Sequence, residues 1–317
     1  IREEFLENLI NVAPKGLSQV HLNNSGAESV EAAIKFARKF SGKKGMAAMK
    51  GSYHGKSMGA LSLTFNPKYR ESFQPLVEKV SFSSYGDIDE LRNTVDKDTA
   101  FVILEPIQGE SGIHIPPDSF LQDVRKLCDE NKILLIFDEI QSGLGRTGSM
   151  WAADHWKTVP DIMCIAKGIA GGVPMGVTLV RPDILSVMKK GEHSSTFGGN
   201  PLSCAAGTAT IQTLTQDGLI ENAKNIGQKF LQGLEEMKSR HKIIREVRGK
   251  GLMIGVELKF EVRDILMEGI KNGLLLLYSG RNILRFLPPL VISEEDVTKT
   301  LKILDGLLTN EEVRRNV

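Results

Sequence analysis

The chain has 317 residues, of which 41% are hydrophobic and 25% charged, and its net charge is +1. That composition is typical of a globular protein with ample material for a core, and a nearly neutral chain favours neither nucleic acid nor an anionic membrane as a partner. No apolar stretch approaches the roughly 20 residues that a membrane-spanning helix needs. The three cysteines form no Cys-x-x-Cys pair and no targeting signal is visible, so we expect free thiols in a cytoplasmic protein.

Strand-like apolar runs alternate with helical patterns through the first two thirds of the chain. The earliest helix is expected at residues 29–40, where Ser25 and Glu28 form the Ser-x-x-Glu pattern that caps helices. The expected strands that follow are 102–104, 133–137, 162–166 and 176–180, and the expected helices are 118–131, 201–215 and 219–240. This order favours a mainly parallel α/β sheet with helices on both faces.

The pattern changes near residue 215. The strands expected beyond it are 252–258, 274–278 and 283–287, and the helices are 262–271 and 293–310. These elements follow one another with hairpin-like spacing, which is typical of a smaller α+β domain. We therefore predict a large domain of residues 1–215 and a small C-terminal domain of residues 216–317.

Two of the expected strands end at ionisable side chains. The run 133–137 leads into Asp138, and the run 162–166 leads into Lys167. Open α/β sheets bind ligands at the carboxyl ends of their parallel strands, so we expect this carboxylate and this amine to share one crevice. An amine that can form a Schiff base, with a carboxylate for a pyridinium nitrogen, is what pyridoxal phosphate requires of a protein.

The segments before these strands allow both a structural and a functional interpretation. Gly26 could let a phosphate approach the amides of a helix N-terminus, although the capping pattern alone explains the segment. Residues 51–57 do not form a Walker-type phosphate loop, because three residues rather than four separate the two glycines. Tyr53 could stack on a flat cofactor ring or pack in the core. His54 has no identifiable partner, so we expect a structural histidine.

Later polar positions are equally open when each is taken alone. Asp138 and the acid after it could cap a helix or bind a cation, but with Lys167 as partner Asp138 becomes a candidate pyridinium contact. Arg285 stands alone among apolar residues, either as an exposed edge-strand arginine or as a clamp for a substrate carboxylate. The polar, glycine-rich segment 193–201 fits a plain loop as well as a phosphate contact.

The order and spacing of these motifs resemble the class III pyridoxal-phosphate-dependent aminotransferases over essentially the whole chain. The segments that carry the resemblance are Ser25-Gly26-Ala27-Glu28, Tyr53-His54-Gly55, Glu105-Pro106-Ile107-Gln108-Gly109-Glu110, Asp138-Glu139-Ile140-Gln141-Ser142-Gly143, Gly145-Arg146-Thr147-Gly148, Pro160-Asp161 through Lys167, and Ser195-Thr196-Phe197-Gly198-Gly199-Asn200-Pro201. Residues 245–255 and 284–289 are similar to the acetylornithine aminotransferase branch, which includes relatives in lysine biosynthesis.

The resemblance implies fold type I. This is a large doubly wound domain with a mainly parallel seven-stranded sheet, a small C-terminal α+β domain, and a homodimer whose active sites lie at the subunit interface. Family members usually open with roughly 60–90 further residues, which this sequence does not contain. Either the sequence is part of a longer protein or the segment was lost. If it was lost, we expect part of the substrate pocket and of the dimer contact to be lost with it.

The resemblance also implies roles for the cofactor site. Lys167 would bond to the cofactor and later carry the proton, and Asp138 would keep the pyridine nitrogen protonated. The other implied contacts are the amides of Gly26 and Ala27 to the phosphate, Tyr53 and Ile140 on the two faces of the ring, Gln141 near the phenolic oxygen, and Thr196 on the phosphate of the neighbouring subunit. No metal site is expected.

For the substrates, the resemblance implies that Arg285 holds the α-carboxylate of glutamate. Glu110 would pair with that arginine when the other substrate lacks a carboxylate there, so that one site serves both. Lys56 and Ser195 complete the implied substrate contacts. Lys56 stands where this branch usually has an arginine, and a lysine keeps the charge but loses the bidentate geometry.

The function implied is the transfer of the terminal amino group of an N-blocked ornithine or lysine to 2-oxoglutarate, in arginine or lysine biosynthesis. The products would be the semialdehyde and glutamate, and the blocking group could be acetyl or a small carrier protein. A 4-aminobutyrate or ornithine aminotransferase is the alternative within the class. The alternative from another class is an inactive relative that acts as a binding or assembly protein.

Overall fold

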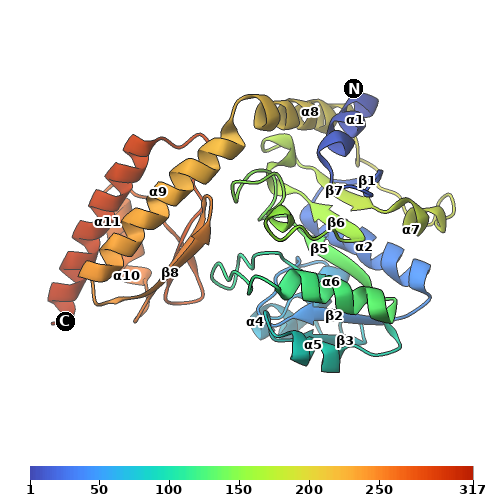
Figure 1. Ribbon diagram of the computed structural model, residues 1–317, viewed down its shortest axis with the longest axis horizontal. Helices are drawn as coiled ribbons and strands as arrows, with labels where there is room; N and C mark the ends of the chain where they lie inside the picture. Colours follow the sequence, from blue (N-terminus) through green and yellow to red (C-terminus); the bar gives the residue numbers. More distant parts are fainter. Residues whose placement is uncertain (317) are drawn as a thin grey trace.

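Two sheets organise the chain, and the computed structural model describes residues 1–316 of it (Figure 1). In spatial order the seven strands of the larger sheet are β1 (Gln19–Asn23), β7 (Gly176–Val180), β6 (Ile162–Ile165), β5 (Leu134–Asp138), β4 (Thr99–Leu104), β2 (Gly45–Met49) and β3 (Val80–Ser83). The pairs from β3 through β2, β4 and β5 to β6 are parallel, whereas β7 is antiparallel to both β6 and β1. The mainly parallel α/β sheet expected from the sequence is confirmed.

Helices cover both faces of this sheet. Helix α2 (Gly26–Ser41) packs on one face and α6 (Phe120–Asn131) packs on the other. Along β4, Phe101 contacts the α2 layer and the next residue, Val102, contacts the α6 layer. A strand that is buried on both sides must be apolar at consecutive positions, which explains the uninterrupted hydrophobic runs in the sequence.

Two further helices cover the β6, β7 and β1 end of the face on which α6 packs, where they share a core cluster with Met163 and Leu179. Helix α1 (Arg2–Val12) packs against α8 (Pro201–Gln216), and Figure 1 shows the two side by side near the N-terminus. The contact is close, because a Cβ at Gly207 would lie 2.5 Å from the ring of Phe5. The shorter segments are α3 (Met58–Leu63), α4 (Pro67–Arg70), α5 (Ile88–Thr94), α7 (Pro182–Ser186) and the 3-10 turns η1 (Glu71–Phe73), η2 (Ala152–Trp156) and η3 (Lys167–Ala170).

The smaller sheet is antiparallel and has a hydrophobic core of its own. Its strands, in spatial order, are β10 (Leu277–Ser279), β11 (Ile283–Phe286), β9 (Met253–Leu258) and β8 (Ile244–Lys250). Its helices are α9 (Leu219–Arg240), α10 (Arg263–Lys271) and α11 (Glu294–Arg315). This is the smaller α+β unit expected from the sequence, while the boundary at residue 215 stays a prediction.

Two expected elements of the smaller unit differ clearly in extent from the structure. The strand expected at 274–278 begins only at Leu277, because only Leu277–Ser279 pair with β11. The last helix continues to Arg315 rather than ending near residue 310. Its final turns are held by Glu311, whose carboxylate accepts hydrogen bonds from Arg314 and Arg315. Side-chain pairing of this kind extends a helix past the point where its apolar pattern fades.

The start of α2 follows the predicted cap with one difference. Ser25 Oγ accepts a hydrogen bond from the Glu28 amide at 3.2 Å, as a capping serine should. The Glu28 carboxylate, however, accepts from the amide of Asn24 at 2.6 Å rather than from that of the cap residue. The helix therefore begins at Gly26, three residues before the expected start, and its first amides lie next to the carboxyl ends of the strands.

Four strands of the large sheet, β2, β4, β5 and β6, lead at their carboxyl ends into loops at one edge. Tyr53, Glu105 and Lys167 follow the ends of β2, β4 and β6, and Asp138 is the last residue of β5; all four line one cavity. An open α/β sheet gathers ligand-binding groups at this edge. Elsewhere, none of the helices within residues 1–316 is both long and apolar enough to cross a membrane.

Candidate active site

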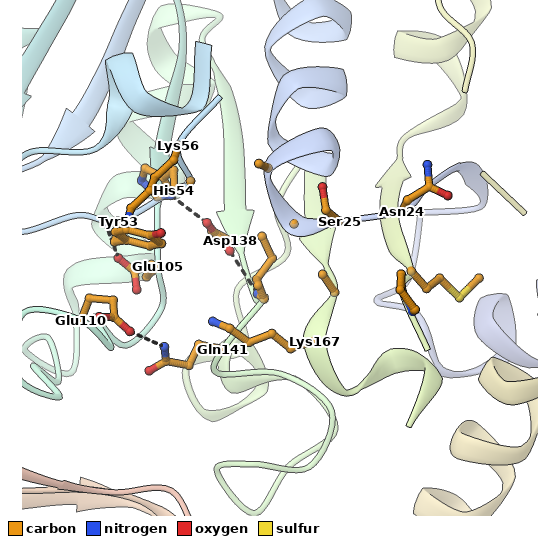
Figure 2. A pocket seen from close by; sticks show the side chains of 17 residues that line it. Asn24, Ser25, Tyr53, His54, Lys56, Glu105, Glu110, Asp138, Gln141 and Lys167 are labelled. Carbon is orange, nitrogen blue, oxygen red and sulfur yellow. Dashed lines mark hydrogen bonds and ion pairs between the residues drawn. The ribbon is translucent and has the colours of Figure 1, made fainter. Parts of the chain in front are cut away.

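A cavity of about 310 Å³ lies between these strand ends and the N-terminus of α2 (Figure 2). Nine of the residues singled out from the sequence line it, namely Gly26, Ala27, Tyr53, Lys56, Glu110, Asp138, Ile140, Gln141 and Lys167. Arg285 lines the adjoining groove, which shares Tyr53 and Glu110 with the cavity. Residues that are far apart in the sequence are thus brought together as the motif order suggested.

Asp138, the last residue of β5, is the buried carboxylate of the cavity. Its side chain is 4% exposed, and its two oxygens accept hydrogen bonds from the Ile140 amide at 3.0 Å and from His54 Nδ1 at 2.8 Å. The expectation that His54 has no partner is therefore wrong. The sequence could not reveal this contact, because the two residues are 84 positions apart and meet only when β2 and β5 share a sheet.

Only one of the two consecutive acids at the end of β5 faces the cavity. Glu139 is buried on the other side, where it accepts hydrogen bonds from Ser142 Oγ at 2.6 Å and from the Ala153 amide at 2.8 Å. Burial raises its pKa to about 7. Successive residues of a strand point to opposite faces, so the pair divides into one carboxylate for the site and one for the support of the next loop.

Lys167 follows β6 and starts the short turn η3. Its φ is +48°, a left-handed conformation that costs energy for a residue with a side chain. Non-glycine residues in such conformations cluster at functional sites, where the surrounding structure enforces them. Figure 2 shows the amine of Lys167 directed into the space that Asp138 and Gln141 also face.

The N-terminus of α2 forms another wall. Gly26 has no space for a side chain, because a Cβ there would lie 2.9 Å from Ile140 Cδ1. Behind the turn, a Cβ at Gly176 would lie 2.2 Å from the carbonyl oxygen of Ser25. The two glycines let β7 and the loop after β5 close in on the helix start. Its unpaired amides and positive dipole end therefore face the cavity, an arrangement that binds phosphate.

Glu110 and Arg285 form an ion pair beside the cavity, with 2.7 Å between Arg285 Nη1 and Glu110 Oε1. The arginine comes from β11 of the small sheet, and the glutamate comes from the loop after β4. Gln141 Nε2 donates to the same oxygen at 3.3 Å, and Ser279 Oγ donates to the Glu110 carbonyl. Partial burial opposes ionisation of Glu110, but the hydrogen bond and charge of Arg285 hold its pKa below the usual value.

Glu105, for which no role was predicted from the sequence, is a second buried carboxylate in the cavity wall. Its oxygens accept from the amides of Tyr53 and Gly109, both at 3.0 Å. Burial raises its pKa to about 7, and the nearby charge of Asp138 adds to that rise. The sequence signal that could have identified Glu105 was its position immediately after β4, because the neighbouring parallel strand β5 ends in Asp138 at the same side of the sheet.

Lys56 lies at the exposed mouth of the cavity rather than in its wall of buried groups. Its Nζ sits 4.6 Å from the ring centroid of Tyr69, a cation–π distance. The ring of Tyr69 in turn meets that of Tyr53 edge to face, with 5.9 Å between the centroids. The Tyr53–Tyr69 ring pair therefore connects the charged Lys56 at the mouth with the interior of the cavity.

Ser195 and Thr196 do not line this cavity. They lie in a separate depression of about 410 Å³ that shares only Asn24 with it. Ser195 Oγ accepts hydrogen bonds from Asn24 Nδ2 at 3.0 Å and from the Gly198 amide at 3.1 Å, while Thr196 is exposed. The substrate role expected for Ser195 and the contact of Thr196 with a neighbouring subunit stay predictions.

An amine, a buried carboxylate and a helix N-terminus around one cavity are the groups that an enzyme with a phosphorylated carbonyl cofactor uses. The sequence pattern of the family Aminotransferase class-III matches residues 2–308, almost the whole chain. This chain belongs to the class III aminotransferases and is a pyridoxal-phosphate-dependent enzyme.

Curated relatives support the same family. The chain is 46% identical over 303 residues to the acetylornithine aminotransferase of Methanopyrus kandleri, covering 95% of this chain and 77% of the relative. It is 41% identical over 312 residues to the [LysW]-aminoadipate semialdehyde/glutamate semialdehyde transaminase of Sulfolobus acidocaldarius, covering 98% and 80%.

Solved structures agree in fold. The ornithine aminotransferase of Toxoplasma gondii matches with a TM-score of 0.95 at 31% identity, covering 99% of this chain and 77% of that one. The acetylornithine aminotransferase of Elizabethkingia anophelis matches with a TM-score of 0.85 at 30% identity, covering 98% and 78%.

The residues of the cavity fit the cofactor. Two buried polar atoms in its wall, His54 Nε2 and Gln141 Oε1, lack a hydrogen-bond partner within residues 1–316, and a polar ligand or water can satisfy such atoms. Without a Cβ, Gly26 lets Ile140 pack closely against the start of α2, whose first residues line the cavity. Lys167 and Asp138 line it as an amine and a carboxylate, which are the kinds of group that a pyridoxal aldehyde and its ring nitrogen need.

Proposed function

We propose that this aminotransferase moves the terminal amino group of an N-blocked ornithine or lysine to 2-oxoglutarate, giving the semialdehyde and glutamate. The observation that carries the proposal is the Glu110–Arg285 pair beside the cavity of Lys167. An arginine that is paired at rest can release its glutamate to receive the α-carboxylate of a substrate. Two chemically different amino donors can then use one site in turn.

The cofactor, when bound, supplies an electron sink for the electron pair that remains when a substrate carbon loses its proton. Lys167 Nζ binds the cofactor at rest and moves the proton between two carbons during turnover. Asp138 keeps the ring nitrogen protonated through its negative charge in a dry site, and the amides of Gly26 and Ala27 bind the phosphate. The remaining proposed cofactor contacts are Tyr53 and Ile140 on the ring faces and Gln141 at the phenolic oxygen.

The choice of donor rests on the relatives. Those compared above are named for acetylornithine and for LysW-linked semialdehydes, which are both N-blocked substrates. Another relative, the ornithine aminotransferase 1 of Staphylococcus saprophyticus, is 41% identical over 294 residues, so free ornithine is the second candidate. Lys56 at the cavity mouth is the proposed contact for the far carboxylate of 2-oxoglutarate.

We also propose a homodimer with shared sites in which Thr196 contacts the phosphate bound by the other chain. Thr196 lies on an exposed loop beside Phe197, which is 70% exposed, as is Leu202 at the start of α8. Exposed apolar side chains of this size are typical of subunit interfaces. A carrier protein that presents the blocked amine is a further proposed partner, with action in the cytoplasm and a domain boundary near residue 215.

A scan of donors tests the substrate. Rates with 2-oxoglutarate as acceptor should rank acetylornithine or carrier-linked lysine above free ornithine, and ornithine above 4-aminobutyrate. The matched control is Glu110→Gln, which removes the charge that pairs with Arg285 but keeps the size of the side chain. If wild-type enzyme prefers free 4-aminobutyrate, the substrate assignment is wrong. If no donor reacts although the cofactor binds, the inactive-relative alternative is correct.

A further inference from the structure

Glu105 stands between two loops of the active site. It follows β4 directly, and its side chain enters the cavity wall, where the residue is 5% exposed. One carboxylate oxygen accepts the amide hydrogen of Tyr53 and the other accepts that of Gly109 (Figure 2 shows the first contact). Tyr53 is the proposed ring contact, and Gly109 immediately precedes Glu110.

The two hydrogen bonds require that both carboxylate oxygens of Glu105 act as acceptors. Each oxygen of Glu105 faces a backbone N–H at 3.0 Å, and an ionised carboxylate is the side chain that offers two acceptors and no donor. Among the described residues Glu105 forms no ion pair, so these two amides are its direct stabilising partners. The contacts that stabilise the charge of Glu105 therefore lie in these two loops, and loss of the charge should weaken the hydrogen bonds to both.

We propose that Glu105 is a positioning residue that fixes the loop of Tyr53 and the loop of Glu110 relative to each other. The ring contact of Tyr53 and the Glu110–Arg285 pair, which opens to admit a substrate carboxylate and is called the carboxylate gate below, then act as one unit. The proposal rests on the gate role of Glu110 and Arg285 put forward above. Tyr85 strengthens the arrangement from below, since its hydroxyl donates to the carbonyl oxygens of Glu105 at 3.1 Å and Pro106 at 2.7 Å.

A fixed gate matters because Glu110 must return to Arg285 after each glutamate half-reaction. Its carboxylate is held by Arg285 and Gln141, both of which a substrate displaces or disturbs. The Gly109–Glu105 bond remains while the gate is open and limits how far the loop can move. A short loop anchored one residue from its functional group keeps that group near its closing position.

The two hydrogen bonds from the amides of Tyr53 and Gly109 to Glu105 tie the two loops together, and this tie depends on pH. Burial raises the pKa of Glu105 to about 7; Asp138 contributes to the rise, while His54 and the two amides oppose it. The charged and titratable groups that face it are thus His54, Asp138 and the phenol of Tyr85. Below about pH 7 a proton on Glu105 replaces one acceptor by a donor that opposes an N–H. The tie is therefore complete at higher pH and weakens as the pH falls.

Glu105→Gln tests the proposal, because the amide has the same size but carries a donor at one end. Hydrogen exchange of the cofactor-free protein at about pH 8, above the pKa of Glu105, should show faster exchange at Tyr53 or Gly109 than in wild type. Glu105→Asp is the matched control, since it keeps the charge but is one methylene shorter and reaches only one amide. Unchanged exchange at both amides in Glu105→Gln overturns the tie.

Single-turnover kinetics test the link to the gate. Glu105→Gln should slow the glutamate half-reaction by roughly tenfold to a hundredfold, the effect of one buried polar group left without its partner. The acid limb near pH 7 should disappear from its pH profile and persist in Glu105→Asp. Equal losses in both half-reactions with the acid limb retained would overturn the positioning role.

Glu110→Gln, measured alongside, separates the two proposals. If it changes the balance between the half-reactions and Glu105→Gln does not, only the role of Glu105 is wrong. If Glu110→Gln leaves that balance unchanged, the gate itself is wrong, and with it the unit proposed here. The exchange result still decides whether Glu105 ties the loops, because it does not depend on turnover.

Discussion

The active-site cavity has two walls of different construction. On one side Asp138 ends β5 and Lys167 follows the adjacent parallel strand β6 of the large sheet, whose side chains are buried on both faces. On the other side the Glu110–Arg285 ion pair joins the loop after β4 to β11 of the small sheet, and Ser279 Oγ and Arg248 Nε donate to carbonyl oxygens of the same loop. The first wall is set by the sheet itself, whereas the second is set by side-chain contacts between that loop and the small sheet.

The burial of the two walls differs accordingly. The His54–Asp138 pair is 0% and 4% exposed, whereas the Arg285 and Glu110 side chains are 11% and 37% exposed. A buried, hydrogen-bonded carboxylate is costly to disturb, while a partly exposed ion pair contributes little net stability and can exchange partners. The buried wall therefore suits chemistry that is common to all substrates, and the exposed wall suits the choice between them.

The largest expected effect is that of Lys167→Ala, on the buried wall. Both half-reactions should slow by about a thousandfold or more, because the variant loses the amine that bonds the cofactor and moves the proton. The cofactor can still bind through the amides of α2 and the ring contacts. Stopped-flow measurement of each half-reaction checks the rates, and borohydride reduction followed by peptide mapping locates the bonded residue.

Lys56→Ala is the matched control, since it removes another amine that lines the same cavity. Peptide mapping should still find the label on Lys167 in this variant, and the loss should fall on the 2-oxoglutarate step. Turnover close to wild type in Lys167→Ala, or a label on a different residue, would contradict the assignment of the buried wall.

A smaller and unequal effect is expected for Arg285→Ala, on the exposed wall. The glutamate half-reaction should fall by roughly thirtyfold, or about 2 kcal/mol, which is typical for a lost hydrogen bond to a charged group. The donor half-reaction should fall less, because a terminal amine brings no carboxylate to that arginine. Rapid-mixing experiments with each substrate alone measure the two rates separately.

Arg281→Ala provides the comparison, because this arginine lines the same groove but its side chain is 86% exposed and pairs with Glu261 at 3.4 Å. Its removal should change neither half-reaction by more than about twofold, as expected for a solvated surface pair. Equal losses of both half-reactions in Arg285→Ala would show that the two walls do not divide the work as proposed.

The same contrast explains what the sequence could predict. Asp138 and Lys167 follow apolar runs of strand length, and the rule that parallel strands deliver such groups to one edge is general. The mainly parallel sheet and the smaller unit could thus be predicted from periodicity, whereas the number of seven strands followed only from the resemblance to the family. The antiparallel direction of β7 could not be predicted, because a strand that is buried on both faces has the same apolar pattern in either direction.

Contacts that depend on packing across the molecule were harder to predict from the sequence. The partner of His54 lies on another strand, and the two ends of Glu105 meet amides of two separate loops. Neither set of contacts corresponds to a periodic pattern or a fixed spacing in the sequence. The start of β10 at Leu277 likewise depends on which residues find partners on β11 rather than on the apolar run that precedes it. Tertiary pairing decides such details.

The smallest expected effect concerns support within the buried wall. His54→Phe removes the donor to Asp138 Oδ2 and leaves that oxygen buried without its protein partner, since only Oδ1 keeps the Ile140 amide. The free energy of unfolding should fall by about 1–3 kcal/mol, and both half-reactions should slow by about tenfold and to the same extent. Denaturant unfolding of the cofactor-free protein and the two single-turnover rates measure these effects.

His54→Asn separates loss of the hydrogen bond from loss of packing, because its amide nitrogen can take the place of Nδ1 while the side chain is smaller than imidazole. If the contact with Asp138 is what matters, the Asn variant should recover most of the rate although it leaves a cavity, and the Phe variant should not. If Phe restores activity better than Asn, the imidazole acts by filling space. A loss confined to one half-reaction would show that His54 contributes to the choice of substrate, which is the task proposed for the exposed wall. Its Nδ1 nevertheless lies 2.8 Å from the Asp138 carboxylate of the buried wall.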